Sequence, residues 1–250
     1  MTIYRRDRNT GKIDQSAESV ATYESAVLVD SPVAFWPMQE ASGDLVDIVA
    51  SRDAILTGTG SVTYSQSGPG GLSSIEFPGT GGTHFAAADN DVWSPTSLTV
   101  EVWLYLSGDW GAGQRFWGSK HAGSGAYSEW LAIIYGSPSF QSYNQITTTS
   151  ATDYRLVDAP VSLTQESWHH MALVYEDSST TLSTYLDGSF VASDNVGSGT
   201  RQGNSSGSFC IGYLPGAPTT ESWKGRMSHF AFYSYALTPT QISNHYSAMQ

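Results

Sequence analysis

Two strand-like runs, the second broken by an Asp-Gly turn, constrain the fold of this chain more than any other feature. Residues 170–175 read His-Met-Ala-Leu-Val-Tyr, an almost continuous apolar run that is typical of a deeply buried strand. The second run, residues 182–191, contains Asp187-Gly188, a dipeptide that favours a two-residue hairpin turn. Together the runs predict antiparallel strands at the centre of an all-β fold.

The same pattern continues along the chain. Residues 98–106 place Leu or Val at every second position, which predicts a strand with one apolar face and one mixed face. Short strands separated by Gly, Ser, Pro or Asn turns are typical of a sandwich. Residues 16–29 favour a helix that Asp30-Ser31-Pro32 ends, and Thr238-Pro239-Thr240-Gln241 is a capping box that begins a short terminal helix.

Composition limits the classes of function. The chain has 250 residues, 40% of them hydrophobic, enough for one sizeable core. Its formal charge of −12 argues against nucleic acid and anionic membranes as partners. The single cysteine, Cys210, excludes an intrachain disulfide and sits in an apolar run, so we expect it in the core and assembly in a reducing cytoplasm. No apolar stretch resembles a secretory signal or a membrane span.

Residues 1–15 form a segment whose charge differs from that of the rest of the chain. The segment contains four of the eleven basic residues of the chain, Arg5, Arg6, Arg8 and Lys12. Arginine suits desolvated, bidentate contacts with acidic partners. We therefore predict that residues 1–30 form an N-terminal arm and helix that anchor the protein, with the four basic side chains as the partner-binding residues.

A series of motifs resembles laminin-G-like, concanavalin A-like jelly-roll domains over residues 27–248. The motifs, in order, are Phe35-Trp36-Pro37-Met38, Ser97-Leu98-Thr99-Val100-Glu101-Val102-Trp103, Trp168-His169-His170, Tyr185-Leu186-Asp187-Gly188, Ile211-Gly212 and Lys224-Gly225-Arg226-Met227. The resemblance implies an all-β, antiparallel jelly-roll β-sandwich over residues 31–250, with an N-terminal arm and short terminal helices. It implies nothing about the ligand, because this fold serves binding, catalytic and structural proteins alike.

A narrower resemblance lies at residues 23–36, Tyr-Glu-Ser-Ala-Val-Leu-Val-Asp-Ser-Pro-Val-Ala-Phe-Trp. This segment is similar to the opening of laminin-G-like virion proteins of tailed bacteriophages, especially those of actinobacterial hosts. It implies a non-enzymatic structural protein on the virion surface, a capsid decoration whose partners are the major capsid protein and neighbouring copies of itself. By analogy with decorations at threefold axes, we expect a homotrimer. The alternatives are a minor tail protein and a carbohydrate-binding module that recognises cell-surface glycans.

The sequence contains candidates for two kinds of binding site. Many proteins of this fold bind calcium at one edge, and the candidates are Asp47 and Asp53. Ser228 and His229 stand where the family normally has two acids, so we expect no cofactor, with calcium as the alternative. Trp110, on a glycine-rich segment, is the first candidate for stacking on a sugar. Tyr127 and Trp223 are weaker candidates, and for all three the alternative is packing against loops or another subunit.

An enzymatic role is not expected. Glucanases of this fold use closely spaced carboxylates on one strand, whereas Glu101 has no second acid near it in the sequence. His169 and His170 are adjacent in a predicted strand, so their side chains point to opposite faces and cannot chelate one ion together.

Overall fold

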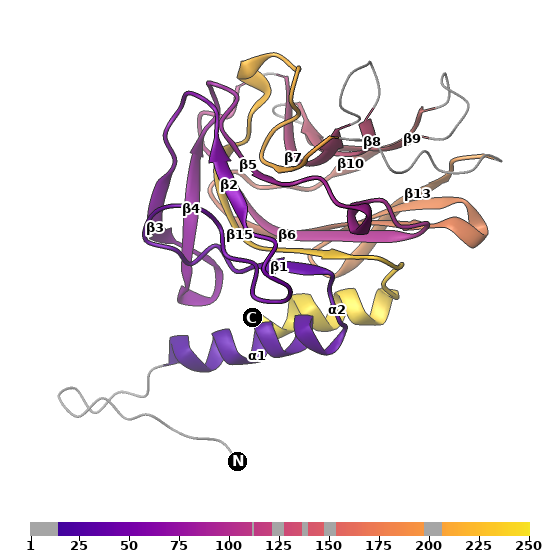
Figure 1. The fold of residues 1–250 in the computed structure, drawn as a ribbon. Helices are drawn as coiled ribbons and strands as arrows, with labels where there is room; N and C mark the ends of the chain where they lie inside the picture. The colour runs from indigo at the N-terminus through magenta and orange to yellow at the C-terminus, as the bar shows by residue number, and fades with distance from the viewer. Residues whose placement is uncertain (1–14, 112, 122–127, 137–139, 148–153, 198–206) are drawn as a thin grey trace.

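The fold is a sandwich of two antiparallel sheets with two helices on one outer face (Figure 1). The computed structural model describes residues 15–111, 113–121, 128–136, 140–147, 154–197 and 207–250. The predicted all-β class, with short terminal helices, is confirmed. The division into a segment 1–30 and a domain 31–250 stays a prediction.

The first sheet contains eight strands among the described residues. Its order is β13 (Ser189–Asn195), β12 (Thr181–Leu186), β11 (Trp168–Glu176), β6 (Leu98–Leu106), β15 (Lys224–Tyr233), β4 (Ser73–Pro78) and β3 (Thr63–Ser67), with β1 (Ala34–Trp36) paired to β15 beside this path. Strands distant in the sequence therefore lie at its centre: β6 pairs with both β11 and β15.

The second sheet contains seven strands in the described part of the chain. Its order is β10 (Tyr154–Val161), β9 (Phe140–Thr147), β8 (Ser128–Tyr135), β7 (Gln114–His121), β14 (Phe209–Ile211), β5 (His84–Ala87) and β2 (Ala54–Thr57). Four single-turn 3₁₀ segments occur among the described connections: Pro69–Gly71, Asp91–Trp93, Asp177–Ser179 and Thr219–Glu221.

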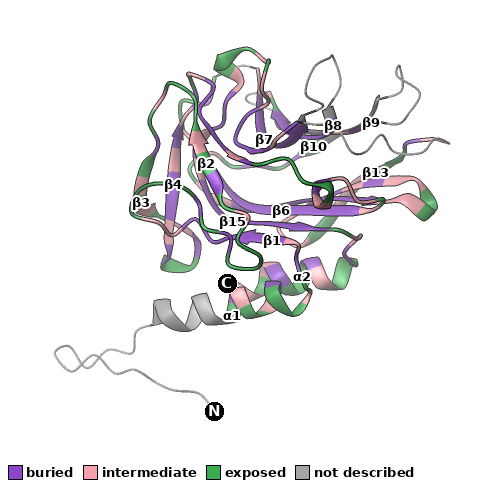
Figure 2. Ribbon diagram, viewed as in Figure 1, coloured by how far each residue is buried: buried purple, intermediate pink, exposed green. Residues whose placement is uncertain are grey.

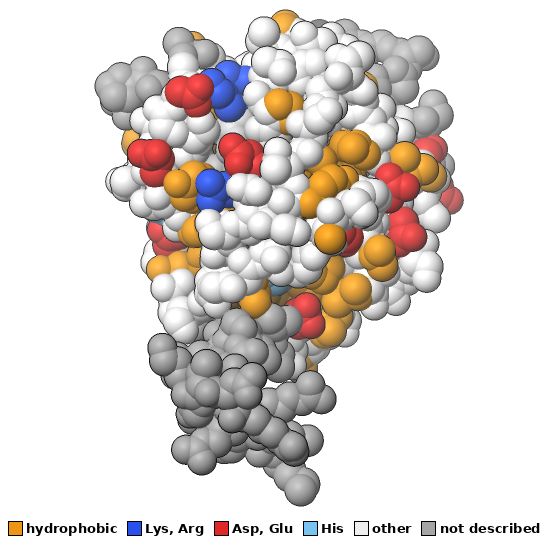
Figure 3. Space-filling model, turned by 90° about the vertical axis from the view of Figure 1, so that its left-hand side faces the viewer, with side chains coloured by type: hydrophobic (Ala, Val, Ile, Leu, Met, Phe, Trp, Pro, Cys, Tyr) orange, Lys and Arg blue, Asp and Glu red, His pale blue; other side chains and the backbone are white. Residues whose placement is uncertain are grey.

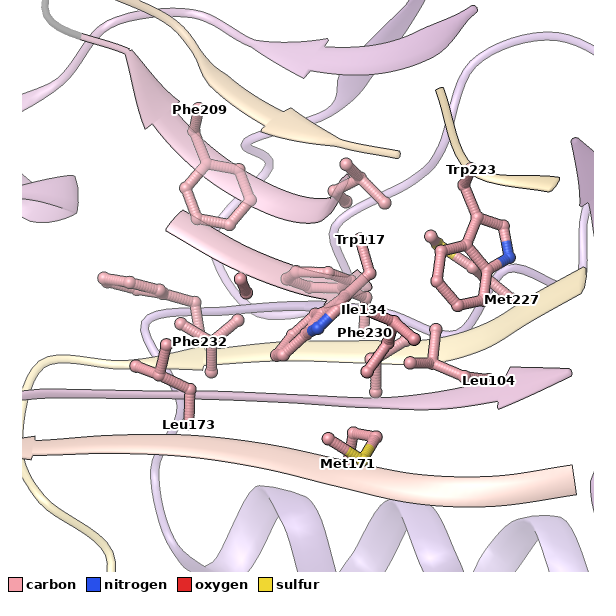
Figure 4. Packing of buried hydrophobic residues seen from close by; sticks show 14 of the residues in the cluster. Leu104, Trp117, Ile134, Met171, Leu173, Phe209, Trp223, Met227, Phe230 and Phe232 are labelled. Atoms are coloured by element: carbon pink, nitrogen blue, oxygen red, sulfur yellow. The ribbon is translucent and has the colours of Figure 1, made fainter. Parts of the chain in front are cut away.

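The space between the sheets is filled by large apolar side chains. Figure 4 shows Trp117 and Phe209 from the second sheet meeting Phe230 and Phe232 of β15. The ring centroids of Phe209 and Phe230 lie 5.8 Å apart at 87°, an edge-to-face geometry that aromatic pairs favour. Cys210 is buried as predicted.

The predicted local signals are present. Asp187 and Gly188 have φ values of 49° and 72° and connect β12 to β13, as the Asp-Gly turn predicts. The helix α2 (Pro239–Ala248) starts at Thr238, whose hydroxyl accepts a hydrogen bond from the backbone N–H of Gln241 in a full capping box.

The helices α1 (Gln15–Val29) and α2 lie side by side against the outer face of the first sheet (Figure 1). Figure 2 shows that the strands beneath them are buried while the described outer sides of the helices are exposed. This layer changes the environment of β6. Its second face, predicted to be mixed, is buried as well, because the helices cover Glu101 and Trp103 and the connection from β15 to α2 covers Thr99. Neither described helix is long and apolar enough to cross a membrane.

Candidate functional site

The layer between the helices and the first sheet contains a buried cluster of charged side chains. Glu101 on β6 has no solvent exposure, and its carboxylate faces the helices. His245 of α2 brings Nδ1 to 3.0 Å from Oε1 and 3.1 Å from Oε2 of Glu101. The hydroxyl of Tyr233 on β15 donates to Oε1 of the same carboxylate at 2.7 Å. Glu101 thus joins the sheet to α2.

The opposite nitrogen of His245 reaches the segment that ends α1. Nε2 of His245 lies 3.0 Å from Oδ2 of Asp30, the residue that follows α1. The side-chain amide of Gln241 donates to the other oxygen of Asp30 at 2.8 Å, and Tyr235 donates its hydroxyl to the backbone carbonyl of Asp30. The chain Asp30–His245–Glu101, which we call the ion triad, therefore fastens both helices to the sheet.

Electrostatics fix the protonation of the triad. Burial would lower the pKa of His245, but Glu101 and Asp30 raise it above its ordinary value. Burial would likewise raise the pKa of Glu101, but His245 and His170 hold it well below its usual range. Because each ring nitrogen of His245 faces a carboxylate oxygen, the ring donates to both as an imidazolium. Because Glu101 is sealed and bonded on both oxygens, it is not presented to a substrate.

Around the triad, several polar atoms are buried without a hydrogen-bond partner in the described structure: Tyr23 Oη, Trp103 Nε1, His170 Nδ1 and His229 Nε2. The rings of Tyr23 and His229 meet edge to face with centroids 5.0 Å apart. Burial lowers the pKa of His229 to about 3, so this imidazole stays neutral. His169 and His170 point to opposite faces as predicted: His169 bonds Asp187, and His170 faces Glu101.

The partner-binding residues predicted in the arm, Arg5, Arg6, Arg8 and Lys12, lie outside the described residues. What the structure defines is the element that follows them. On α1, Tyr23 and Val27 are fully buried against the first sheet. The helix that follows residues 1–14 in the sequence is therefore fixed on the face of the first sheet opposite the second sheet.

The prediction that glycines leave Trp110 exposed is wrong. Trp110 is fully buried, and its ring meets that of Trp223, also buried, at 5.0 Å and 76°. The guanidinium of Arg115 lies 5.7 Å from the centre of the Trp110 ring and donates to its backbone carbonyl. These tryptophans close the rim of the core, so neither can stack on a sugar. Tyr127 lies outside the described residues.

An aromatic side chain that the sequence did not single out is exposed instead. Tyr135, at the end of β8, is 49% exposed. It pairs with Gln114 on β7 and Gln141 on β9, and directly paired residues project to the same face of a sheet. The amide of Gln114 donates to Glu221 at 2.9 Å, so the ring lies between the Gln114 carbonyl oxygen and the Gln141 amide, which combine a stacking surface with hydrogen-bonding groups. The signal in the sequence was a Tyr that closes an apolar run just before Gly136.

The candidate calcium residues have a different role. Asp47 is buried, and its two carboxylate oxygens accept hydrogen bonds from four backbone N–H groups. The donors are Phe35, Val49, Ala50 and Arg52. Asp53 accepts from the N–H of Asp47 itself. The pair organises a loop, and no group of three or more His, Cys, Asp or Glu side chains in the described part of the chain could hold a metal ion.

Solved structures with the same architecture have low sequence identity to this chain. A heptameric SAP-like pentraxin from Limulus polyphemus is 20% identical with a TM-score of 0.56, covering 68% of this chain and 79% of that one. Domain 4 of a Geobacillus stearothermophilus arabinanase, solved with arabinotriose, is 16% identical with a TM-score of 0.57, covering 88% and 98%. A Trypanosoma rangeli sialidase is 13% identical with a TM-score of 0.64, and the match covers 92% of this chain but 38% of the sialidase.

These likenesses establish the fold, which is lectin-like and occurs in binding domains and in enzymes. Among curated proteins, no sequence matches the chain. The family described as Concanavalin A-like lectin/glucanases superfamily matches residues 79–243, well over half of the sequence. The match begins at the end of β4 and extends into α2, so it includes the greater part of both sheets. The chain therefore belongs to the laminin-G-like branch of the concanavalin A-like lectin/glucanase superfamily.

Proposed function

We propose that this chain is a non-enzymatic structural protein of a phage virion, held on the particle by its N-terminal segment and displaying the lectin-like sandwich outward. The observation that carries the proposal is the ion triad. It fastens the C-terminal end of α1 to the first sheet through Asp30, so α1 is fixed on one side of the domain. The second sheet lies on the other side of the sandwich (Figure 1).

The distribution of charge supports an anchoring role for the first residues. Residues 1–14 contain four of the eleven Lys and Arg residues and two of the 23 acids, which gives the segment a formal charge of +2. The remaining residues then have a charge of −14. A basic segment on an acidic body favours contact with an acidic neighbour, such as a capsid protein or another copy.

The segment that resembles phage virion proteins is also a coherent unit of this structure. Tyr23 and Val27 are the buried face of α1, Asp30 belongs to the ion triad, and Phe35 and Trp36 are buried in β1. The motif thus contains the residues that seat α1 on the sandwich. This supports a common way of attaching the domain to the virion in this chain and in the proteins it resembles. We propose that the chain is a capsid decoration.

Particle labelling tests the proposal directly. Gold-labelled antibody against the chain should decorate the heads of particles in the source lysate. Deleting residues 1–14 should abolish incorporation while the far-ultraviolet circular dichroism and melting temperature of the purified chain stay unchanged. Label confined to tails would place the protein there, as a minor tail protein. Wild-type incorporation of the truncated chain would overturn the anchor, and unlabelled particles would overturn the virion assignment.

Glycan binding by the displayed sandwich is a second candidate function, favoured by the exposed Tyr135 between Gln114 and Gln141. The arabinanase domain of the same fold was solved with arabinotriose, which shows that this architecture can hold a saccharide. A glycan array on the purified chain tests it. Binding should be lost in Tyr135→Ala and kept in Phe190→Ala, which removes an equally exposed ring from the other sheet. Equal glycan binding by both variants would show that Tyr135 is not part of the glycan-binding site.

A further inference from the structure

Six of the eight large hydrophobic side chains that are exposed in the described part of the chain come from two segments. They are Leu28 and Val29 at the end of α1, and Val46, Ile48, Val49 and Ile55 in residues 44–57. The N–H of Ile48 donates to the carbonyl of Phe35, and the Arg52 guanidinium donates to that of Val33. These bonds join residues 44–57 to the chain just after α1. We call the six side chains the aliphatic patch.

The surroundings of the patch are acidic. On the face drawn in Figure 3, hydrophobic side chains gather in the right-hand half with Asp and Glu among them, whereas the Lys and Arg side chains lie in the left-hand half, where Asp and Glu also occur. Residues 40–57 contain three acids that are not buried, Glu40, Asp44 and Asp53, and one base, Arg52. That base is directed inward, since its guanidinium also lies 5.9 Å from the centre of the Trp93 ring.

Residues 44–57, which carry four of the six side chains of the aliphatic patch, are held in place by hydrogen bonds from their backbone N–H groups to nearby carboxylates. Glu40 accepts from the N–H of Val46 and Asp44 from that of Leu56, each at 2.9 Å, in addition to the bonds of Asp47. The aliphatic side chains therefore stand on a backbone with fixed geometry, which reduces the entropy lost when a partner binds.

On the edge strand of the second sheet, the backbone groups near the patch already have hydrogen-bond partners. Ala54 on the edge strand β2 exchanges both backbone hydrogen bonds with Leu45, and Asp44 caps the N–H of Leu56. A partner therefore cannot bind by adding a strand along these residues. It must bind through side chains, with apolar groups on the patch and positive charge opposite the acids. Two patches facing each other would instead set like charges together, which is unfavourable.

This chain contains one segment with the required chemistry. Residues 1–14 read Met-Thr-Ile-Tyr-Arg-Arg-Asp-Arg-Asn-Thr-Gly-Lys-Ile-Asp, which combines apolar side chains with four basic ones at a formal charge of +2. We infer that residues 1–14 of one copy bind the aliphatic patch of a second copy. The inference deepens the anchoring role proposed above, because it names a neighbouring copy as a partner of the segment.

The position of α1 allows the segment to reach a second copy, and the dependence of association on concentration separates this from binding within one chain. The segment joins α1 at Gln15, whereas Leu28 and Val29 of the patch are at the opposite end of the helix, about 20 Å away at 1.5 Å per residue. Fourteen extended residues span up to about 46 Å, enough to reach a neighbouring molecule. Such a contact is heterologous, so it builds a ring or a chain of copies.

Sedimentation velocity of the purified full-length chain tests the inference. The wild type should associate with increasing concentration, and 0.5 M salt should weaken the association because charge contributes to it. A patch variant, Val49→Ser with Ile55→Ser, and a segment variant, Arg5→Ser with Arg6→Ser and Arg8→Ser, should each associate at least tenfold more weakly. Phe190→Ser, an exposed apolar change outside the patch, should associate like the wild type.

Mixing the two defective variants gives the decisive result. The patch variant retains an intact segment and the segment variant an intact patch, so an equimolar mixture should recover association as a one-to-one dimer. That recovery also shows that the segment variant has a folded patch, and an unchanged melting temperature and far-ultraviolet circular dichroism should show the same for the patch variant. A monomeric wild type, a segment variant that associates normally, or a mixture without recovery would each overturn the inference. These measurements use no particles, so the inference and the proposed function can fail separately. A chain that is monomeric but still enters virions leaves the proposed function intact. A chain that associates but is absent from virions overturns only that function.

Discussion

Nδ1 of His245 lies 3.0 Å from Oε1 of Glu101 in a region that solvent does not reach. Nε2 of the same ring lies 3.0 Å from Oδ2 of Asp30. An imidazole that faces a carboxylate with each nitrogen can donate to both only when it is doubly protonated. The geometry therefore requires an imidazolium, and this single charge couples α1, α2 and the first sheet.

Replacing His245 should destabilise the fold strongly. His245→Gln leaves two carboxylates, one of them fully buried, without their cation, and breaking a buried pair costs about 3–5 kcal/mol. Urea denaturation at pH 6.5 measures the change in the free energy of unfolding. The control is Asn244→Ala, an exposed position on the same helix, which should change that free energy by less than about 0.5 kcal/mol. A His245→Gln loss as small as the control would contradict the triad.

The raised pKa of His245 predicts how the free energy of unfolding changes above pH 6.5. The pKa of His245 is raised in the folded state, so its contribution is fully present below the unfolded value of about 6.5 and is lost as the pH rises through the raised value. The free energy of unfolding of the wild type should therefore decrease as the pH rises above 6.5. His245→Gln should lack this decrease in a denaturation series across that range, and an identical slope in both proteins would refute it.

On the acid side, His229 should limit stability. Burial lowers its pKa to about 3, so between pH 6.5 and pH 3 the unfolded chain binds a proton that the folded chain does not. Stability should then fall by up to about 1.4 kcal/mol per pH unit as the pH decreases. His229→Asn suits its positive φ of 54° and should reduce the slope between pH 6.5 and 5. His84, whose pKa burial also lowers, adds to the slope, so some should remain. An unchanged slope in His229→Asn would show that His229 does not cause the loss of stability at low pH.

The architecture was predictable from the sequence because it depends on local periodicity. The alternation in β6, the Asp187-Gly188 turn and the Thr238 capping box each determine a structure within a few residues. The ion triad was not predictable in this way. Its partners lie 144 and 215 residues apart, and the sequence of β6 does not reveal that two helices will cover Glu101.

Trp110 shows the limit of local reasoning at a site. Its flanking glycines do produce a turn, in which the N–H of Trp110 donates to the carbonyl of Ser107. The direction of the ring depends instead on Arg115, whose guanidinium also binds the carbonyls of Gly79 and Ser222 and draws three loops together. Composition indicated a loop correctly but could not indicate which way its largest side chain would point.

The role of Asp47 leads to a prediction about calcium. Asp47→Ala removes the acceptor of four backbone N–H groups and should lower the free energy of unfolding by about 3 kcal/mol. Asp194→Ala, an exposed carboxylate that accepts from its neighbour Asn195, should have little effect. Since the oxygens of Asp47 are already occupied, millimolar calcium or a chelator should leave the melting temperature of the wild type unchanged. A rise with calcium would restore Asp47 and Asp53 as ligands.

Trp110 and Tyr135 should separate stability from binding. Trp110→Ala leaves a cavity between Trp223 and Phe140 and should lower the free energy of unfolding by about 3–5 kcal/mol. Tyr135→Ala, at a half-exposed ring, should change that free energy by less than about 1 kcal/mol and should remove whatever saccharide affinity the wild type has. Urea denaturation and glycan titration of the same two preparations check both halves. Saccharide affinity that is kept in Tyr135→Ala would show that Tyr135 does not form the sugar site.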